Sequence, residues 1–203
     1  MRQVKNFKYS TNASTSIDNF YTLSTAVNGF GSNSFFSSVQ SSAKEVIQFE
    51  NGKYSIFSIA NWFLLKGEMT HKKLQKLCYY AQAWCYALKG YRLVNSDFQA
   101  WVHGPVSPAL YDRFKCFRYN AIRIKLEHNP EIEPEDIELL ENIWDTYGDK
   151  TGNALEALSH RELPWMEARR GYATDERCTV VINPETMRDY YRSIFIGGEQ
   201  WQN

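Results

Sequence analysis

The sequence contains no apolar run long enough to cross a membrane. A transmembrane helix needs roughly 18 consecutive, mostly apolar residues, and the 203-residue chain has no such stretch. The N-terminus, MRQVKNFKYS, carries basic residues but lacks the apolar segment that follows them in a secretory signal peptide. We therefore expect a cytoplasmic protein that has no membrane partner.

The chain also has few cysteines and no Cys-x-x-Cys pair. The four thiols are Cys78, Cys85, Cys116 and Cys178. In a reducing cytosol such thiols behave as small buried hydrophobes. A zinc site would need further ligands from His71, His103 or His160, and no ligand spacing supports it. We expect neither a metal nor a cofactor.

Catalytic signatures are missing as well. The sequence contains no Gly-x-Ser-x-Gly, no His-Glu-x-x-His and no glycine-rich phosphate loop. A Cys–His nucleophile pair stays open, because such partners can be distant in sequence. Cys78 and Cys85, however, share an apolar helical stripe where thiols are inert. His103 and His160 remain candidates for acid–base chemistry, but we favour a structural role for both and expect no enzyme.

Net charge is zero, yet the charges are unevenly distributed. Residues 66–125 hold eleven Lys/Arg against three Asp/Glu, whereas residues 127–149 hold nine Asp/Glu and no Lys/Arg. This asymmetry has two interpretations: two solvated faces of one domain, which we favour, or a dipolar surface that steers a charged partner. A nucleic-acid-binding domain is usually basic overall, so DNA binding is not expected.

Residues 1–53 differ from the rest of the chain. They are rich in Ser, Thr and Asn and contain no Pro, which is typical of a flexible tail. Weak helical patterns cover residues 17–27 and 35–47. The segment either becomes ordered on a partner or is an extension without a role. We place the domain boundary at residue 54, so the compact domain is residues 54–203.

Helix signals are frequent after residue 54. Polar capping residues, prolines at the first helical position and glycine stops bound a series of apolar periodic segments. The predicted helices run from Ser55 to Leu65, from Thr70 to Gly90, onward from Pro108 with Ser107 as its cap, from Pro134 to Gly148, onward from Thr151, and from Pro184 through Ile194. The last of these carries the tyrosine pair Tyr190 and Tyr191.

The helix at 70–90 is unusual on both faces. One face is an apolar stripe with the 3.6-residue period of a buried helix, made of Leu74, Leu77, Cys78, Ala81, Trp84, Cys85 and Leu88. The other face mixes Lys72 and Lys76 with Tyr79, Ala83 and Tyr86. A solvated face rarely carries two aligned tyrosines, so a second layer covers this face or a partner binds it. We favour the second layer and expect this helix to be central.

Three short segments have β character: 98–102, 121–126 and 179–182. The predicted fold is therefore mostly α, a compact helical domain with a small β element of short strands. Between the first segment and the helix at Pro108 lies WVHGPVSP, residues 101–108. We interpret it as a strand exit, a Gly-Pro corner and a helix start, in which Gly104 allows unusual dihedrals and Pro105 fixes the direction.

Three motifs, in order, carry a family resemblance: MTHKKLQKLCYYAQAW, FQAWVHGPVSPALYDRF and LSHRELPW. The chain resembles the Panacea domain of GepA-like and SocA-like phage-associated antitoxins over residues 54–195. The resemblance implies an antitoxin that neutralises a cognate protein toxin by direct contact, in a bacterial or phage-infected bacterial cell. One family member is an adaptor for a Clp-type protease, so such a protease is a second implied partner.

The resemblance also assigns individual residues. Its motif positions, which we expect to be mainly structural, are Leu74, Lys76, Leu77, Tyr80, Trp101, Gly104, Pro105, Val106, His160, Pro164 and Trp165. The residues predicted to contact a toxin are Tyr79, Tyr86, His103 and Tyr111. Three other functions stay open: a proteolytic adaptor, a hydrolase or transferase using His103 or His160, and a DNA-binding repressor.

Overall fold

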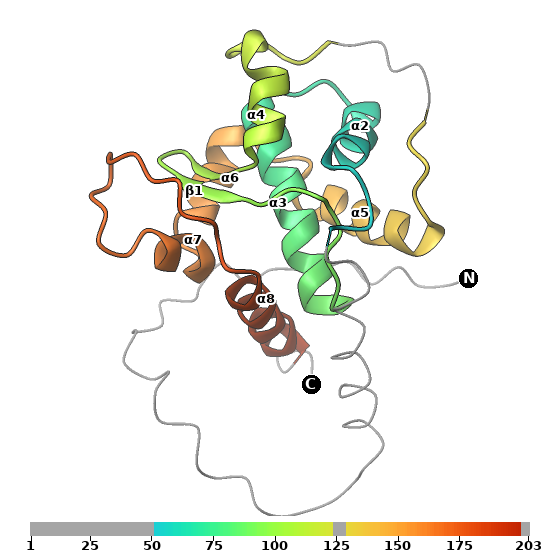
Figure 1. Cartoon of the computed structure of the whole chain (residues 1–203). Helices are drawn as coiled ribbons and strands as arrows, with labels where there is room; N and C mark the ends of the chain where they lie inside the picture. Colours follow the sequence, from blue (N-terminus) through green and yellow to red (C-terminus); the bar gives the residue numbers. More distant parts are fainter. Residues whose placement is uncertain (1–50, 124–128, 200–203) are drawn as a thin grey trace, which may run out of the picture.

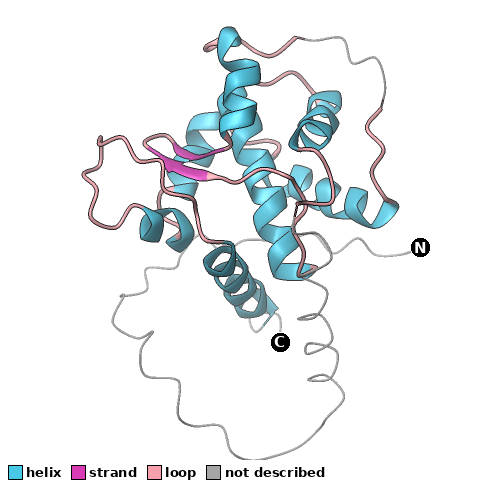
Figure 2. Ribbon diagram, in the orientation of Figure 1, coloured by secondary structure: helices cyan, strands magenta, loops and turns pink. Residues whose placement is uncertain are grey.

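The structure is a computed structural model, and it describes residues 51–123 and 129–199. In this part of the chain helices surround one short two-stranded hairpin (Figures 1 and 2). The elements are α2 (Ile56–Lys66), α3 (His71–Leu88), β1 (Gln99–Trp101), β2 (Gly104–Val106), α4 (Pro108–Phe114), the 3-10 helix η3 (Lys115–Phe117), α5 (Pro134–Tyr147), α6 (Gly152–Ser159), α7 (Leu163–Ala168) and α8 (Pro184–Glu199). The predicted fold class, mostly helical with a small β element, is confirmed.

Side-chain caps fix where the helices begin. The hydroxyls of Ser55, Thr70, Ser107 and Thr151 each accept a hydrogen bond from a backbone N–H in the first turn of α2, α3, α4 and α6. These N–H groups have no partner inside the helix, so a polar side chain at the cap stabilises its start. The starts predicted from these residues are confirmed. The two helical patterns in residues 17–47 lie outside the described residues.

Helix α3 is the centre of the domain (Figure 1). It contacts α2, α4, α5, α6, α8 and β2. Its predicted stripe is buried except for Leu88 at the end, which is 36% exposed. The opposite face is buried as well: Tyr79 has no exposed surface and Lys76 is 1% exposed. A second layer therefore covers the face that carries tyrosines and lysines, as predicted.

The β element is a hairpin, which corrects the predicted Gly-Pro corner. Gly104–Val106 pairs antiparallel with β1 in the register Trp101↔Gly104 and Ala100↔Pro105. The N–H of Ala100 points away from β2, because it donates to the Val180 carbonyl at 2.9 Å. Pro105 thus occupies a position where its missing N–H is not needed for pairing. Sequence reasoning did not recognise this strand because proline is rare inside strands.

The two other predicted strands are not formed in the described residues. Around Thr179–Ile182 there is one isolated bridge, Gln99↔Val181, and around Ala121 there is one bridge to Thr70. Residues 124–126 of the second predicted strand lie outside the described residues. Segments of three or four residues can have β composition yet pair at one point only, because their pairing depends on the neighbours that the fold supplies.

Two smaller expectations also need correction. Cys78, Cys85 and Cys178 are buried as predicted, but Cys116 is exposed on η3. Helix α7 was not predicted, because its six residues are too short for a periodic pattern. Among the described residues, no helix is long and apolar enough to cross a membrane.

The two oppositely charged segments contact each other instead of forming two separate solvated faces. Lys66 pairs with Glu141, and both Lys53 and Lys89 pair with Asp136. Asp136 lies in the first turn of α5, and its side chain is fully buried. Part of the charge asymmetry therefore joins α5 to α2, to the end of α3 and to the chain just before α2.

Candidate protein-binding surface

The first two family motifs meet where α3 crosses the hairpin. The Gln75 side chain donates to the Ser107 carbonyl at 3.1 Å and accepts from the Ser107 N–H at 2.8 Å. Lys76 donates through Nζ to the Pro105 carbonyl at 2.9 Å. Both side chains are buried. These bonds satisfy backbone groups that a buried loop would otherwise leave unpaired, so α3 fixes the shape of the segment from β2 to α4.

Lys76 has an unusual environment for an amine. Burial lowers its pKa from 10.5 to about 7, although the nearby Glu156 carboxylate opposes the shift. Its stem also packs against Gly104: a Cβ added there would lie 2.8 Å from Lys76 Cε and 2.9 Å from the Ser159 hydroxyl. Gly104 has φ +91°, a conformation that favours glycine. The motif residues Lys76 and Gly104 thus act together as a structural contact.

The third motif closes the hairpin from the other side. The indole of Trp165 donates to the Trp101 carbonyl at 3.0 Å. The ring of His160 stacks on Trp165, with centroids 4.0 Å apart. Burial is the largest cause that lowers the pKa of His160, so the imidazole is neutral near pH 7. The predicted structural role of Trp165 and His160 fits these contacts.

Arg169 is a buried residue that sequence reasoning missed. It is 6% exposed and donates to the Ala100 carbonyl at 2.9 Å and to three carbonyls of the loop after α7, those of Ala173, Thr174 and Glu176. Its guanidinium also lies 5.2 Å from the Trp165 ring centroid. An arginine with five donors can satisfy several loop carbonyls at once. No periodic signal marks such a residue, because its partners come from an irregular loop.

Glu162 is a second buried residue that the sequence did not reveal. Its Oε2 accepts from the hydroxyls of Tyr80 at 3.2 Å and Tyr191 at 2.8 Å. Burial raises the pKa of Glu162 from 4.5 to about 7, although both hydroxyl bonds oppose the shift. The contact joins α3, the start of α7 and α8. It gives the motif residue Tyr80 a structural role.

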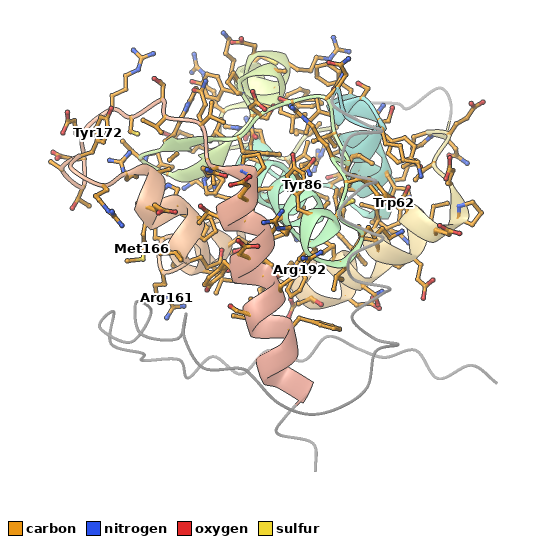
Figure 3. The ribbon with its side chains drawn as sticks, turned by 60° about the horizontal axis from the view of Figure 1, so that its bottom comes forward. Trp62, Tyr86, Arg161, Met166, Tyr172 and Arg192 are labelled. Atoms are coloured by element: carbon orange, nitrogen blue, oxygen red, sulfur yellow. The ribbon has the colours of Figure 1, made fainter. Side chains whose placement is uncertain are left out.

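Two of the four predicted toxin contacts lie in the core. Tyr79 is fully buried, and its ring packs edge-on against Phe98. Tyr86 is 8% exposed; Figure 3 shows it beside α8, where Arg192 also lies. Neither phenol is presented at the surface. The tyrosines were predicted as contacts from their helical face, but the structure buries both of them, with Phe98 and Tyr191 of α8 against Tyr79.

His103 and Tyr111 do reach the surface and lie in one region. His103 occupies the hairpin turn with 71% of its side chain exposed, and its Nδ1 lies 2.9 Å from Glu156 of α6. Lys72 of α3 donates to the other oxygen of Glu156 at 2.6 Å. Tyr111 packs edge-on against Trp101, with centroids 4.9 Å apart. We call Lys72, Trp101, His103, Tyr111 and Glu156 the hairpin surface.

Glu156 is the charged centre of the hairpin surface. Burial would raise the pKa of Glu156, but the hydrogen bonds from Lys72 and His103 outweigh it and lower the pKa. The carboxylate is thus ionised and positions both neighbours. His160 is only half-buried, but its Nε2 is buried, so it does not form with His103 the pair of exposed imidazoles that the hydrolase hypothesis requires. Among the described residues, no cluster of His, Cys, Asp and Glu could hold a metal ion.

Comparisons with known proteins identify the same three motifs. Residues 74–166 match the family described as "Antitoxin SocA-like, Panacea domain". Antitoxin SocA of Caulobacter vibrioides (strain NA1000 / CB15N) is 28% identical over 134 residues, which cover 59% of this chain and 70% of that protein. No solved structure matches the chain. The match spans the segments that build the hairpin contacts, from Leu74 of α3 to Met166 of α7, and over these residues the chain is similar to the Panacea domain of SocA-like antitoxins.

Proposed function

We propose that this protein is an antitoxin that neutralises a cognate protein toxin by direct contact through the hairpin surface. The similarity to antitoxin SocA carries the proposal. The placement of the motifs supports it, since all three hold in a fixed shape one hairpin whose turn exposes His103. The adaptor for a Clp-type protease stays a prediction of the resemblance, and no observation favours it over simple neutralisation.

The residues of the hairpin surface suit protein recognition. Aromatic side chains contribute much of the energy of protein interfaces, while charged residues at the rim set specificity and speed of association. Trp101 and Tyr111 supply a half-buried aromatic pair, and Lys72, Glu156 and His103 surround it. The hairpin is held by buried hydrogen bonds to Lys76, Gln75 and Trp165. A rigid surface loses little conformational entropy on binding.

Co-expression tests the proposal. The product of the gene adjacent to this one is expressed in a bacterial host, alone and together with the full-length protein. We expect growth arrest when the adjacent product is alone, rescue by this protein, and a complex that co-purifies. The proposal is wrong if the adjacent product is harmless alone, or if it stays toxic while this protein accumulates in folded form.

A surface variant then tests the site. Replacing His103 with Ala and Lys72 with Ala removes one exposed and one half-buried side chain, neither of them in the core, so the fold should persist. We expect weaker rescue and a higher Kd, mainly through slower association, as for loss of charged residues at the rim of an interface. Tyr172→Ala is the matched control, because Tyr172 is exposed on the loop after α7, at the edge of the molecule (Figure 3). Equal Kd values for the hairpin variant and the control would mean that the toxin does not bind the hairpin surface.

A further inference from the structure

The end of α4 presents an aromatic side chain almost entirely to solvent. Tyr119, two residues after η3, is 95% exposed. Among the other large apolar side chains that the structure describes, Leu65 is 48% exposed and the rest less. Figure 1 shows α4 projecting at the top of the molecule, so its end is an outlying point. We call residues 113–123 the α4 tip.

The backbone at the α4 tip is held in an uncommon conformation. Arg118 has φ 51° and ψ −115°, and it is the non-glycine residue with positive φ in the described part of the chain. Such backbone strain persists only where the surroundings fix it. The N–H of Arg118 donates to the Lys115 carbonyl at 3.1 Å, and that of Asn120 donates to the Phe117 carbonyl at 2.9 Å. The tip that carries Tyr119 is therefore an ordered turn.

The charges at the tip are all of one sign. Residues 113–123 contain Arg113, Lys115, Arg118 and Arg123 and no Asp or Glu. Lys115 pairs with Asp112, and Arg123 pairs with Glu68. Within the described residues, Arg113 and Arg118 have no acidic partner, and both are exposed. Two unbalanced guanidinium groups thus lie on the segment that ends in the exposed phenol, and Arg118 directly precedes Tyr119 in the chain.

The tip continues the hairpin surface along α4. Tyr111 contacts Trp101 on one side, and on the other the ammonium of Lys115 lies 5.8 Å from the Tyr111 ring centroid. One turn further along the chain lie Arg118 and Tyr119. A single partner that covers Trp101 and Tyr111 would reach the tip without crossing another element. Interfaces of standard size take about 20–30 residues from each partner, more than the hairpin surface provides alone.

We propose that the α4 tip is the second half of the toxin-binding surface, with Tyr119 as an aromatic anchor and Arg113 and Arg118 facing an acidic patch on the toxin. This inference rests on the proposed function. The positive charge of the tip favours a partner surface that is acidic. A protein surface rich in Asp and Glu offers planar carboxylates, which guanidinium groups bind in a bidentate manner. Tyr and Arg are also the side chains enriched in interface hot spots.

The experiment measures binding of the adjacent gene product, in a form inactivated for toxicity, to the purified full-length protein by calorimetry. Tyr119→Ala is expected to raise Kd at least about tenfold. Arg118→Gly removes one cation while the glycine accepts the same backbone conformation, so it should weaken binding without lowering Tm. Raising KCl from about 50 to about 300 mM should slow association of the wild type more than that of an Arg113→Gln, Arg118→Gly double variant.

The outcomes separate the two proposals. If the wild type does not bind the adjacent product, the proposed function fails and this inference fails with it. If the wild type binds, but Tyr119→Ala and Arg118→Gly bind as tightly as the control Tyr172→Ala, the function stands and the α4 tip is not its surface. A duplex DNA of the upstream promoter is the second probe. Loss of DNA binding in the tip variants with unchanged toxin Kd would overturn the inference in favour of a nucleic-acid surface.

Discussion

At the scale of single residues, burial brings the pKa of two ionisable groups close to neutral pH. Burial lowers the pKa of Lys76 to about 7 and raises the pKa of Glu162 to about 7. Within the described residues, neither side chain forms an ion pair. Lys76 donates to a backbone carbonyl, and Glu162 accepts from two tyrosine hydroxyls. Both therefore couple the stability of the domain to pH.

Glu162→Gln should stabilise the protein above neutral pH. Between pH 4.5 and about 7 the unfolded carboxyl loses its proton while the folded one keeps it, so wild-type stability falls as pH rises. The shift corresponds to about 3 kcal/mol. Because both tyrosine hydroxyls donate to Oε2, an amide oxygen can replace it. Urea unfolding should show the variant more stable at pH 8 and equal to the wild type near pH 4.5.

The matched control is Glu138→Gln, an exposed carboxyl on α5. It should leave the free energy of unfolding unchanged within about 0.5 kcal/mol at both pH values. A Glu162→Gln difference that is the same at pH 4.5 and pH 8 would contradict the assignment of a proton to this buried carboxyl.

At the scale of elements, the hairpin is defined by one glycine and the lysine beneath it. Gly104 follows a two-residue turn, has φ +91° and lies against Lys76 and Ser159. Position 104 favours glycine for two independent reasons: its φ is positive, and there is no space for a Cβ. A second glycine in the chain, Gly171, has φ +90° but no atom within 4 Å of an added Cβ. Comparing Gly104 with Gly171 therefore separates the cost of the positive φ from the cost of the added Cβ.

Gly104→Ala should therefore destabilise the domain more than Gly171→Ala. The Gly171 variant bears only the cost of a left-handed conformation, about 1–2 kcal/mol. The Gly104 variant bears a similar cost and also displaces Lys76 or Ser159, for a total of about 3 kcal/mol or more. Chemical unfolding of both variants measures this difference. Equal losses would mean that Lys76 moves freely and does not hold the hairpin.

At the scale of the whole molecule, Asp136 joins three separate parts of the chain. Its carboxylate accepts from Lys53 at 2.7 Å, from Tyr54 at 2.8 Å, from Lys89 at 2.8 Å and from Tyr91. Burial would raise the pKa of Asp136, but the hydrogen bonds, foremost those from Lys53 and Lys89, hold it at about 2. The segment that leaves residues 1–50 is thereby tied to the start of α5 and the end of α3.

Asp136→Asn should lower the free energy of unfolding by about 3 kcal/mol or more, because partly buried Lys89 loses its charge partner and Lys53 loses its buried one, keeping the exposed Glu133. Asp145→Asn, on the exposed side of α5, is the control and should change stability little. The wild type should lose stability as pH falls from about 4 to about 2, where the folded carboxyl takes up its proton. Urea unfolding of the three proteins across this range checks both statements, and an Asp136→Asn loss no larger than that of Asp145→Asn would contradict them.

The elements with a local signal could be predicted from the sequence. Helix starts at Ser55, Thr70, Ser107 and Thr151 depend on the capping residue and its neighbours, and these starts are confirmed. The strand at Gly104–Val106 and helix α7 were missed, because a proline conceals the first and six residues are too few to mark the second. The residue boundary at 54 and the role of residues 1–53 stay predictions.

The residues of the candidate site also include some whose exposure the sequence predicts and some whose burial it does not. His103 is exposed because a hairpin turn exposes its central residues, and Tyr111 reaches the surface beside Trp101. Tyr79 and Tyr86 were expected on a binding face, yet both are buried, and Phe98 and Tyr191 of α8 pack against Tyr79. Helical periodicity tells which residues share a face, but it does not tell whether another element covers that face.

The sequence by itself determined the capped helices and the central position of α3, since these depend on short-range pattern, and its motif order indicated the resemblance to the Panacea domain. Only the tertiary structure decided the partners of Lys76, Asp136, Glu162 and Arg169, because each contact joins residues far apart in the chain. It also decided which tyrosines are buried and that Tyr119 stands in solvent. Burial is a property of packed elements, and no single segment of sequence contains it.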